Sequence, residues 1–145
     1  MNPHIELLQE TVKLIGTRKW LEVSYVFPFG FHEVKEPTRK NISVEDFLYT
    51  SVDSDFDTCV FHILLGCGVK LDIFIEALEL YPSVIILEHD STSTDWNSEA
   101  IRREHCIANC ITSEELLKIA EQKKWSCSEV YHMKNNRNMI MEITR

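Results

Sequence analysis

The sequence predicts an α/β fold, in which helices flank a mostly parallel sheet and the chain ends in an antiparallel strand pair. Three observations lead to this prediction. Continuous apolar runs within 55–68 and 83–89 are typical of strands buried on both faces. Segments with apolar residues at helical spacing alternate with these runs, which favours parallel strands joined by helices. Near the C-terminus, two neighbouring segments alternate apolar and polar residues.

The N-terminal segment predicts a helix followed by a strand. A helix is expected over about residues 3–15, because Pro3 suits a first helical turn and Gly16 suits a stop. Its apolar residues recur at helical spacing, at Ile5, Leu8, Val12 and Ile15. Residues 18–29 are rich in aromatic and β-branched side chains, so we expect a strand that ends at Pro28.

The next segment is interpreted as a polar connection that leads into a short helix. Residues 30–41 are mostly polar, and a short strand over 31–34 is left open. Ser43, with Asp46 three positions later, is typical of the N-cap of a helix. The strand within 55–68 then follows.

The second half of the chain predicts three further helices and three strands. Residues 69–81 place apolar side chains on one helical face, and a strand over 83–89 follows. After a polar loop, we expect one helix from about residue 98 and another that is capped at Thr112 or Ser113. The closing strands are separated by Lys134, Asn135 and Asn136 and are interpreted as a hairpin or a close antiparallel pair.

Composition limits the class of protein. The 145 residues suit a single domain, 1–145. With 15 basic and 23 acidic residues the formal charge is −8, which disfavours a nucleic acid and favours a basic protein partner. No run approaches the roughly 18 apolar residues that a membrane span needs, and the N-terminus lacks a secretory signal, so we expect a cytoplasmic protein. A homo-oligomer is left open.

Cysteine usage favours buried thiols over a disulfide framework or a metal site. Five cysteines would leave one unpaired, and they lie among apolar residues, as expected in a reducing compartment. Cys106 and Cys110 share one helical face beside His105. A zinc set would need the remaining cysteines, Cys59, Cys67 and Cys127. Because no Cys-x-x-Cys pair occurs, we expect no metal, and a metal or redox module is the weakest interpretation.

Ionisable residues at strand ends are the candidate site. Glu88, His89 and Asp90 follow the most apolar strand, at the edge where open α/β sheets bind ligands. His89 is a candidate general base that Asp90 or Asp57 would orient. A solvated strand end whose groups cap the next turn is the alternative interpretation.

His62 interrupts the preceding apolar run. It either points into the same crevice or lies in the core with one nitrogen hydrogen-bonded to backbone.

The block 55–92 resembles part of the class I S-adenosylmethionine-dependent methyltransferases. Phe56 and Asp57 match the opening of a strand motif of that family. The matches in the helix and the next strand are Asp72, Ala77, Leu78, Ile85, Ile86, His89 and Asp90. The resemblance extends over roughly residues 41–145, since 42–48 resembles the segment that precedes this motif. It implies a Rossmann-like fold.

The departures from the family pattern lie in the cofactor half. His62 stands where the family has an acid, and Leu65 where it has a histidine. Ser24 replaces the first glycine of the cofactor turn, after Glu22, and the bulky residues 25–28 would block close approach. The chain between Glu22 and residue 42 is too short for the family's second and third βα units.

These departures imply a methyltransferase-like domain that has lost S-adenosylmethionine and acts as an acidic inhibitor or regulatory module on a protein partner. No cofactor is then expected. The alternative is a minimal active methyltransferase, with Glu22 and Ser24 at the cofactor. His89, Asp90, Asp57 and His62 would then be the catalytic candidates.

Overall fold

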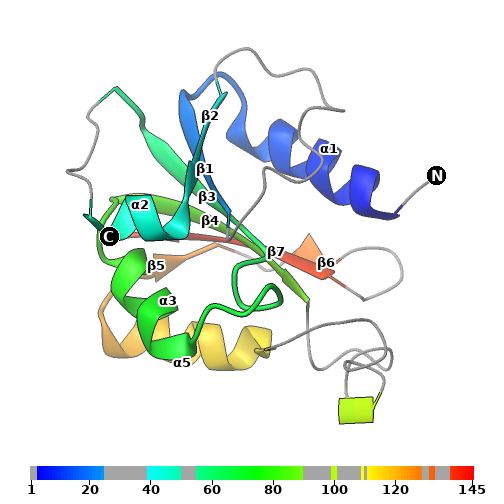
Figure 1. The fold of residues 1–145 in the computed structure, drawn as a ribbon, viewed down its shortest axis with the longest axis vertical. Helices are drawn as coiled ribbons and strands as arrows, with labels where there is room; N and C mark the ends of the chain where they lie inside the picture. The colour runs from blue at the N-terminus through cyan, green and yellow to red at the C-terminus, as the bar shows by residue number, and fades with distance from the viewer. Residues whose placement is uncertain are drawn as a thin grey trace.

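A computed structural model describes residues 3–24, 39–49, 55–89, 99–100, 109, 111–128, 131–132 and 138–145. Helices lie on both faces of a single seven-stranded sheet (Figure 1). The helices are α1 (Pro3–Ile15), α2 (Val44–Tyr49), α3 (Leu71–Leu78) and α5 (Ser113–Gln122). The strands are β1 (Trp20–Ser24), β2 (Arg39–Ser43), β3 (Thr58–His62), β4 (Ser83–His89), β5 (Ser126–Cys127), β6 (Tyr131–His132) and β7 (Asn138–Thr144).

The sheet is mixed, as the sequence predicts. Strands β2, β1, β3 and β4 are parallel neighbours in that order. Strand β7 runs antiparallel to β4, and both β5 and β6 pair with β7 in antiparallel register. The chain leaves β1 for β2 on one side and then crosses to β3 on the other side. The carboxyl ends of β1 and β3 therefore form the topological switch point of the sheet.

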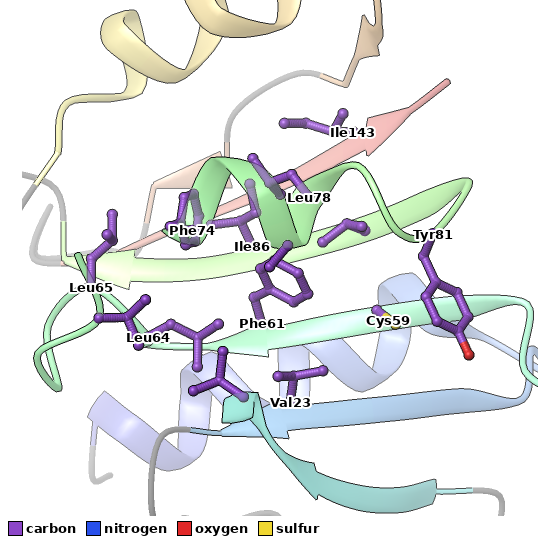
Figure 2. Packing of buried hydrophobic residues seen from close by; sticks show 14 of the residues in the cluster. Val23, Cys59, Phe61, Leu64, Leu65, Phe74, Leu78, Tyr81, Ile86 and Ile143 are labelled. Atoms are coloured by element: carbon purple, nitrogen blue, oxygen red, sulfur yellow. The ribbon is translucent and has the colours of Figure 1, made fainter. Parts of the chain in front are cut away.

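One face of the sheet packs against α2, α3 and α5. Aromatic rings connect the layers: Phe47 of α2 packs edge-on against Phe61 of β3, which contacts Phe74 of α3 in the same way. Phe47 also stacks on Tyr81, with ring centroids 5.7 Å apart. Figure 2 shows Phe61, Phe74 and Ile86 within this core. We call this side the three-helix face.

The opposite face packs against α1. Leu7, Leu8 and Ile15 of α1 are buried against alternate residues of the strands. Those strand residues are Trp20, Val60, Ile85, Leu87 and Ile140. Because both faces are covered, the central strands are apolar on both sides, which explains their continuous apolar runs in the sequence.

Two helix caps confirm the predicted starts of α2 and α5. The backbone N–H of Asp46 donates to Ser43 Oγ at 3.2 Å. The backbone N–H of Glu115 donates to Thr112 Oγ1 at 3.0 Å, so Thr112 is the N-cap. The helix predicted over residues 3–15 is confirmed as α1.

Strand β2 was not predicted, because residues 39–41 fall within the polar connection expected over 30–41 and residues 42–43 within the segment expected to open the short helix. Their parallel pairing with β1 over five residues outweighs the local sequence pattern.

The apolar run of the third strand does not continue as a strand. Strand β3 ends at His62, and the chain turns at once through Ile63, whose φ is +52°. Leu64 and Leu65 are buried in the turn that follows. Tertiary burial, rather than strand extension, therefore accounts for these residues.

Some predictions fall outside the described residues. These are the option of a strand over 31–34, the chain that leaves β1 after Ser24, and most of the helix expected from residue 98, of which residues 99–100 are described as helical. None of the helices in the described ranges combines the length and apolar character needed to span a bilayer.

Candidate functional site

The candidate site lies at the carboxyl ends of β1, β3 and β4. It contains two polar clusters, one on each face of the sheet. Glu22 and His62 lie on the α1 face, since they alternate with residues of the three-helix core such as Val23 and Phe61. Glu88 lies on the three-helix face, because its neighbour Leu87 belongs to the α1 core.

Glu22 and His62 form a buried pair at the switch point. His62 Nδ1 and Glu22 Oε1 are 3.2 Å apart and share a hydrogen bond. The two side chains are 1% and 0% exposed. A buried carboxylate beside one imidazole nitrogen fixes the orientation of the ring. His62 is buried, as the core interpretation expects, and its Nδ1 lies beside Glu22 Oε1.

Glu88 holds the turn that follows β3. Its Oε1 accepts from the backbone N–H of Leu65 at 2.7 Å, and its Oε2 accepts from the N–H of Gly66 at 3.3 Å. The side chain is completely buried. Burial raises the pKa of Glu88 to about 8, although the hydrogen bonds from Leu65, Gly66 and His89 act in the opposite direction. Desolvation is therefore the larger effect.

The turn 63–69 is tightly packed against β4. A Cβ atom on Gly66 would lie 2.7 Å from Ile63 Cγ2 and 3.0 Å from His89 Cδ2. His89 is thus in contact with the turn, and it is half-buried. The sequence placed Glu88 and His89 at a strand end. Glu88 is not the solvated group of the alternative interpretation, because it is completely buried and accepts from the turn that follows β3 rather than from the turn that follows β4.

Asp57 does not belong to this site, so the prediction that it orients His89 is wrong. Asp57 precedes β3, whereas His62 ends it, and five strand residues separate the two ends by roughly 16 Å. At the amino end of the sheet, Asp57 N donates to Lys19 O and Asp57 Oδ2 accepts from Lys19 N. Asp57 therefore lies at the opposite edge of the sheet from His89. Asp90 lies outside the described residues.

Ser24 is the last residue of β1 and is 1% exposed. It pairs with Ser43 of β2 and lies on the same face as Glu22. Both cofactor candidates are therefore at the switch point and buried. The residues that would form the cofactor turn, 25–38, lie outside the described part of the chain.

The described cysteines are poor nucleophiles. Burial raises the pKa of the Cys59, Cys67 and Cys127 thiols, and the nearby Glu88 adds to the effect at Cys67. No group of three metal-ligating side chains occurs among the described residues. Cys106, Cys110 and His105 lie outside them, so the proposed helical pair is not described.

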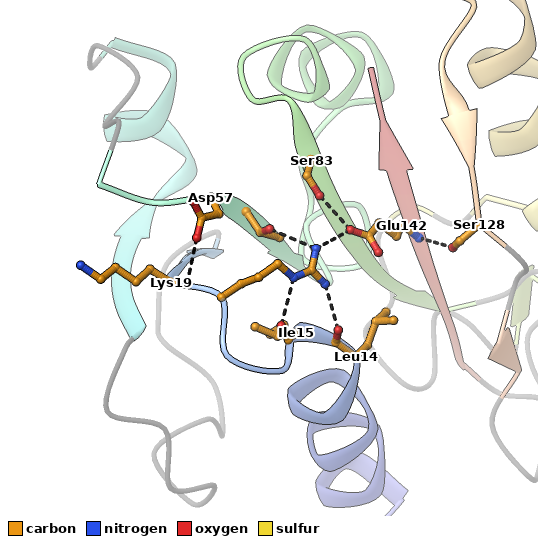
Figure 3. Close-up of polar contacts among 9 residues, drawn as sticks. Leu14, Ile15, Lys19, Asp57, Ser83, Ser128 and Glu142 are labelled. Atoms are coloured by element: carbon orange, nitrogen blue, oxygen red, sulfur yellow. Dashed lines mark hydrogen bonds and ion pairs between the residues drawn. The ribbon is translucent and has the colours of Figure 1, made fainter.

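A second polar network, at the amino end of the sheet, was missed in the sequence. Arg18 donates to Glu142 Oε2 at 2.7 Å, to Thr58 Oγ1 and to the carbonyl oxygens of Leu14 and Ile15 (Figure 3). Ser83 Oγ also donates to Glu142 Oε2, at 2.8 Å. The network joins the end of α1 to three strands. No local sequence pattern predicts this network, because Arg18 and Glu142 are 124 positions apart.

No family model and no curated protein matches the chain. The comparison therefore rests on solved structures. Magnesium protoporphyrin IX methyltransferase from Synechocystis PCC 6803, solved with bound SAH, matches with a TM-score of 0.68 at 9% identity. The match covers 99% of this chain and 84% of that protein. A SAM-dependent methyltransferase from Archaeoglobus fulgidus gives 0.67 at 8% identity, with 99% and 95% covered.

The pyocyanin biosynthetic protein PhzM gives a TM-score of 0.66 at 11% identity. The match covers 96% of this chain but 54% of PhzM, so the chain spans about half the length of that relative. At such low identity these likenesses establish the fold alone. Together with the sheet order and the antiparallel β7, they show that the chain has the Rossmann-like fold of the class I S-adenosylmethionine-dependent methyltransferases.

Proposed function

We propose that this chain is a methyltransferase-like domain that has lost S-adenosylmethionine binding and acts by binding a basic protein partner, as an inhibitor or regulator. The observation that carries the first half is the Glu22–His62 pair. Its side chains are 0% and 1% exposed at the topological switch point, where a cofactor of this fold class would have to reach them.

The described residues at this point fit the cofactor poorly. A carboxylate binds the hydroxyl or ammonium groups of a ligand only if the ligand can approach it, and Glu22 is directed toward His62 instead. Ser24 adds a side chain where a glycine would allow backbone N–H groups to approach a ligand closely. Binding would require breaking a buried pair, which costs several kcal/mol, about 3–5.

The partner half of the proposal rests on charge. The formal charge of the chain is −8. On α2, α3 and α5 and at their ends, the exposed acids are Glu45, Asp46, Asp72, Glu76, Glu79, Glu114, Glu115 and Glu121. The exposed lysines there are fewer: Lys70, Lys118, Lys123 and Lys124. An excess of acids on the helices of one face attracts a basic protein and speeds its association.

Calorimetry with S-adenosylmethionine and with S-adenosylhomocysteine tests the loss of the cofactor. We expect no binding heat with either compound, while an active methyltransferase of the same fold gives a clear isotherm in the same buffer. A dissociation constant in the micromolar range or below would overturn the proposal. Thermal denaturation with the same compounds is a second readout, since a ligand of the native state raises Tm.

Matched charge variants test the partner surface. Asp72→Asn with Glu76→Gln removes two charges from α3, and Asp55→Asn with Glu99→Gln removes two elsewhere. Basic proteins should bind the first variant more weakly than the second, and this difference in affinity should become smaller at high salt. Equal binding by wild type and both variants would remove the electrostatic basis of the proposal.

An active S-adenosylmethionine-dependent methyltransferase is the second candidate. It is favoured by the match over 99% of the chain to an enzyme that was solved with bound SAH. In this case Glu22 and Ser24 would line the cofactor and His89 would act as the base. The same calorimetry separates the two candidates.

A further inference from the structure

The backbone is strained where β3 ends. Ile63, the first residue after the strand, has a φ of +52°. A β-branched residue rarely adopts this left-handed conformation, because its Cβ lies too close to the following carbonyl oxygen. Such a conformation persists only where the surrounding structure imposes it. The contacts around Ile63 therefore decide whether the turn 63–69 keeps its shape.

Contacts with the end of β4 hold the turn by its N–H groups. Ile63 N donates to Leu87 O at 2.9 Å. The carboxylate of Glu88 accepts from the N–H groups of Leu65 and Gly66. The turn therefore lies over the last residues of β4.

Asn109 holds the same turn by its carbonyl oxygens. Its backbone N–H donates to Leu65 O and its Nδ2 donates to Val69 O, each at 3.1 Å. Asn109 and Val69 are 40 positions apart in the chain, and Asn109 comes shortly before Thr112, the N-cap of α5. These bonds and those from β4 use different atoms of the turn, so both sets exist together. Asn109 thus fastens the turn to the segment that leads into α5.

The turn covers ionisable residues at the edge of the sheet. Leu64 and Leu65 are 0% and 1% exposed and lie in the three-helix core (Figure 2). Glu88 is completely buried beneath the turn. A Cβ atom on Gly66 would lie 3.0 Å from His89 Cδ2, so the turn also packs against this ring. Open α/β sheets bind ligands at the carboxyl ends of their strands, which is the edge that the turn covers.

We propose that the turn 63–69 is a gate over the carboxyl ends of β3 and β4, and that Asn109 is its latch. In the closed form, the latch and β4 hold Ile63 in its strained conformation. In the open form, Ile63 returns to an ordinary backbone conformation, and a ligand gains access to Glu88 and His89. The strain favours opening and the latch opposes it, so their difference sets the open fraction. The gate does not depend on whether S-adenosylmethionine binds.

Hydrogen exchange of the full chain, at one pH, tests whether the gate opens. The reporters are the amides of Cys67, Gly68 and Val69, which donate to carbonyl oxygens within the closed turn. They should exchange at least about 10-fold faster than the amides of Ile85 and Ile86 in β4, after correction for intrinsic rates. Equal protection of the two sets would overturn the inference, because the turn would then open only when the whole domain unfolds.

Asn109→Ala tests the latch, because it removes the bond from Nδ2 to Val69 O. The open fraction of the turn should rise about 5- to 10-fold, while exchange in β4 changes less. Thr112→Ala is the matched control, since it removes a bond of 3.0 Å that caps α5 and does not involve the turn. It should change exchange in the turn much less. An equal change in both variants would overturn the role of Asn109.

A pair of substitutions at Ile63 tests the strain. Ile63→Asn and Ile63→Thr both replace the apolar side chain by a polar one, but threonine keeps the β branch and asparagine tolerates a positive φ. The turn should be open about 10-fold less often with asparagine than with threonine. Equal exchange in the two variants would overturn the inference. This comparison and the wild-type measurement remain decisive if Asn109→Ala does not fold.

Discussion

The charged groups at the two edges of the sheet differ in their exposure to water. At the amino edge, Arg18 pairs with Glu142, and the side chains are 31% and 17% exposed, so water shares their solvation. At the carboxyl edge, Glu22 and His62 are sealed from water, and Glu88 is buried without a cation among the described residues. The amino edge is therefore stabilised by a partly hydrated ion pair. The carboxyl edge depends on burial remaining intact.

The largest expected effect is at the carboxyl edge. His62→Ala should lower the free energy of unfolding by about 3–5 kcal/mol, because Glu22 would be left buried without its imidazole partner. Urea denaturation followed by circular dichroism measures it. Replacing both residues, as Glu22→Met with His62→Leu, should cost much less than His62→Ala alone. A loss below about 1 kcal/mol for His62→Ala would mean that water reaches the pair.

Gly66→Ala should lower the free energy of unfolding by about 1–3 kcal/mol. The added methyl group would lie 2.7 Å from Ile63 Cγ2, and both atoms are held by a tight turn. Gly16→Ala is the matched control, because nothing lies within 4 Å of its Cβ position and its cost of about 1 kcal/mol comes only from a φ of +65°. Equal decreases in Tm for Gly66→Ala and Gly16→Ala would show that the turn relaxes around the methyl group.

Arg18→Ala should cost less than His62→Ala, about 1–2 kcal/mol. Glu142 would keep its bond from Ser83 and gain water, since it is already partly exposed. The stability of Arg18→Ala should also fall less steeply with added salt than that of wild type, because a screened ion pair has been removed. A loss as large as that of His62→Ala would erase the proposed difference between the edges.

The smallest effect is expected at the Lys123–Glu79 pair, which joins the ends of α5 and α3 at 2.8 Å. Both side chains are more than 40% exposed, so solvent screens the attraction. Lys123→Ala should change the free energy of unfolding by less than about 1 kcal/mol. A larger change, measured by the same denaturation, would indicate packing by the lysine stem rather than charge.

Local sequence patterns predicted most of the fold. Apolar periodicity located α1 and α3, the Thr112 cap located α5, and continuous apolar runs located β3 and β4. The patterns failed where tertiary contacts dominate: β2 exists because β1 pairs with it, and Ile63 leaves the strand because the turn buries the next two leucines. Of the candidate site residues, Glu22, Ser24, His62 and His89 lie at the carboxyl ends of their strands, whereas Asp57 lies at the amino end of β3.

The sequence by itself determined that Glu88 would stand at the end of an apolar strand and that His62 would fall within an apolar run, because a continuous apolar run indicates burial on both faces of a sheet. Only the tertiary structure decided that Glu22 would lie beside His62. It also decided that Glu88 would accept hydrogen bonds from the backbone of Leu65 and Gly66, which precede it in the chain by 23 and 22 positions. The physical reason is that a hydrogen bond depends on the distance between two atoms in space. Residues far apart in the chain come together only through the register of the sheet and the path of the turn.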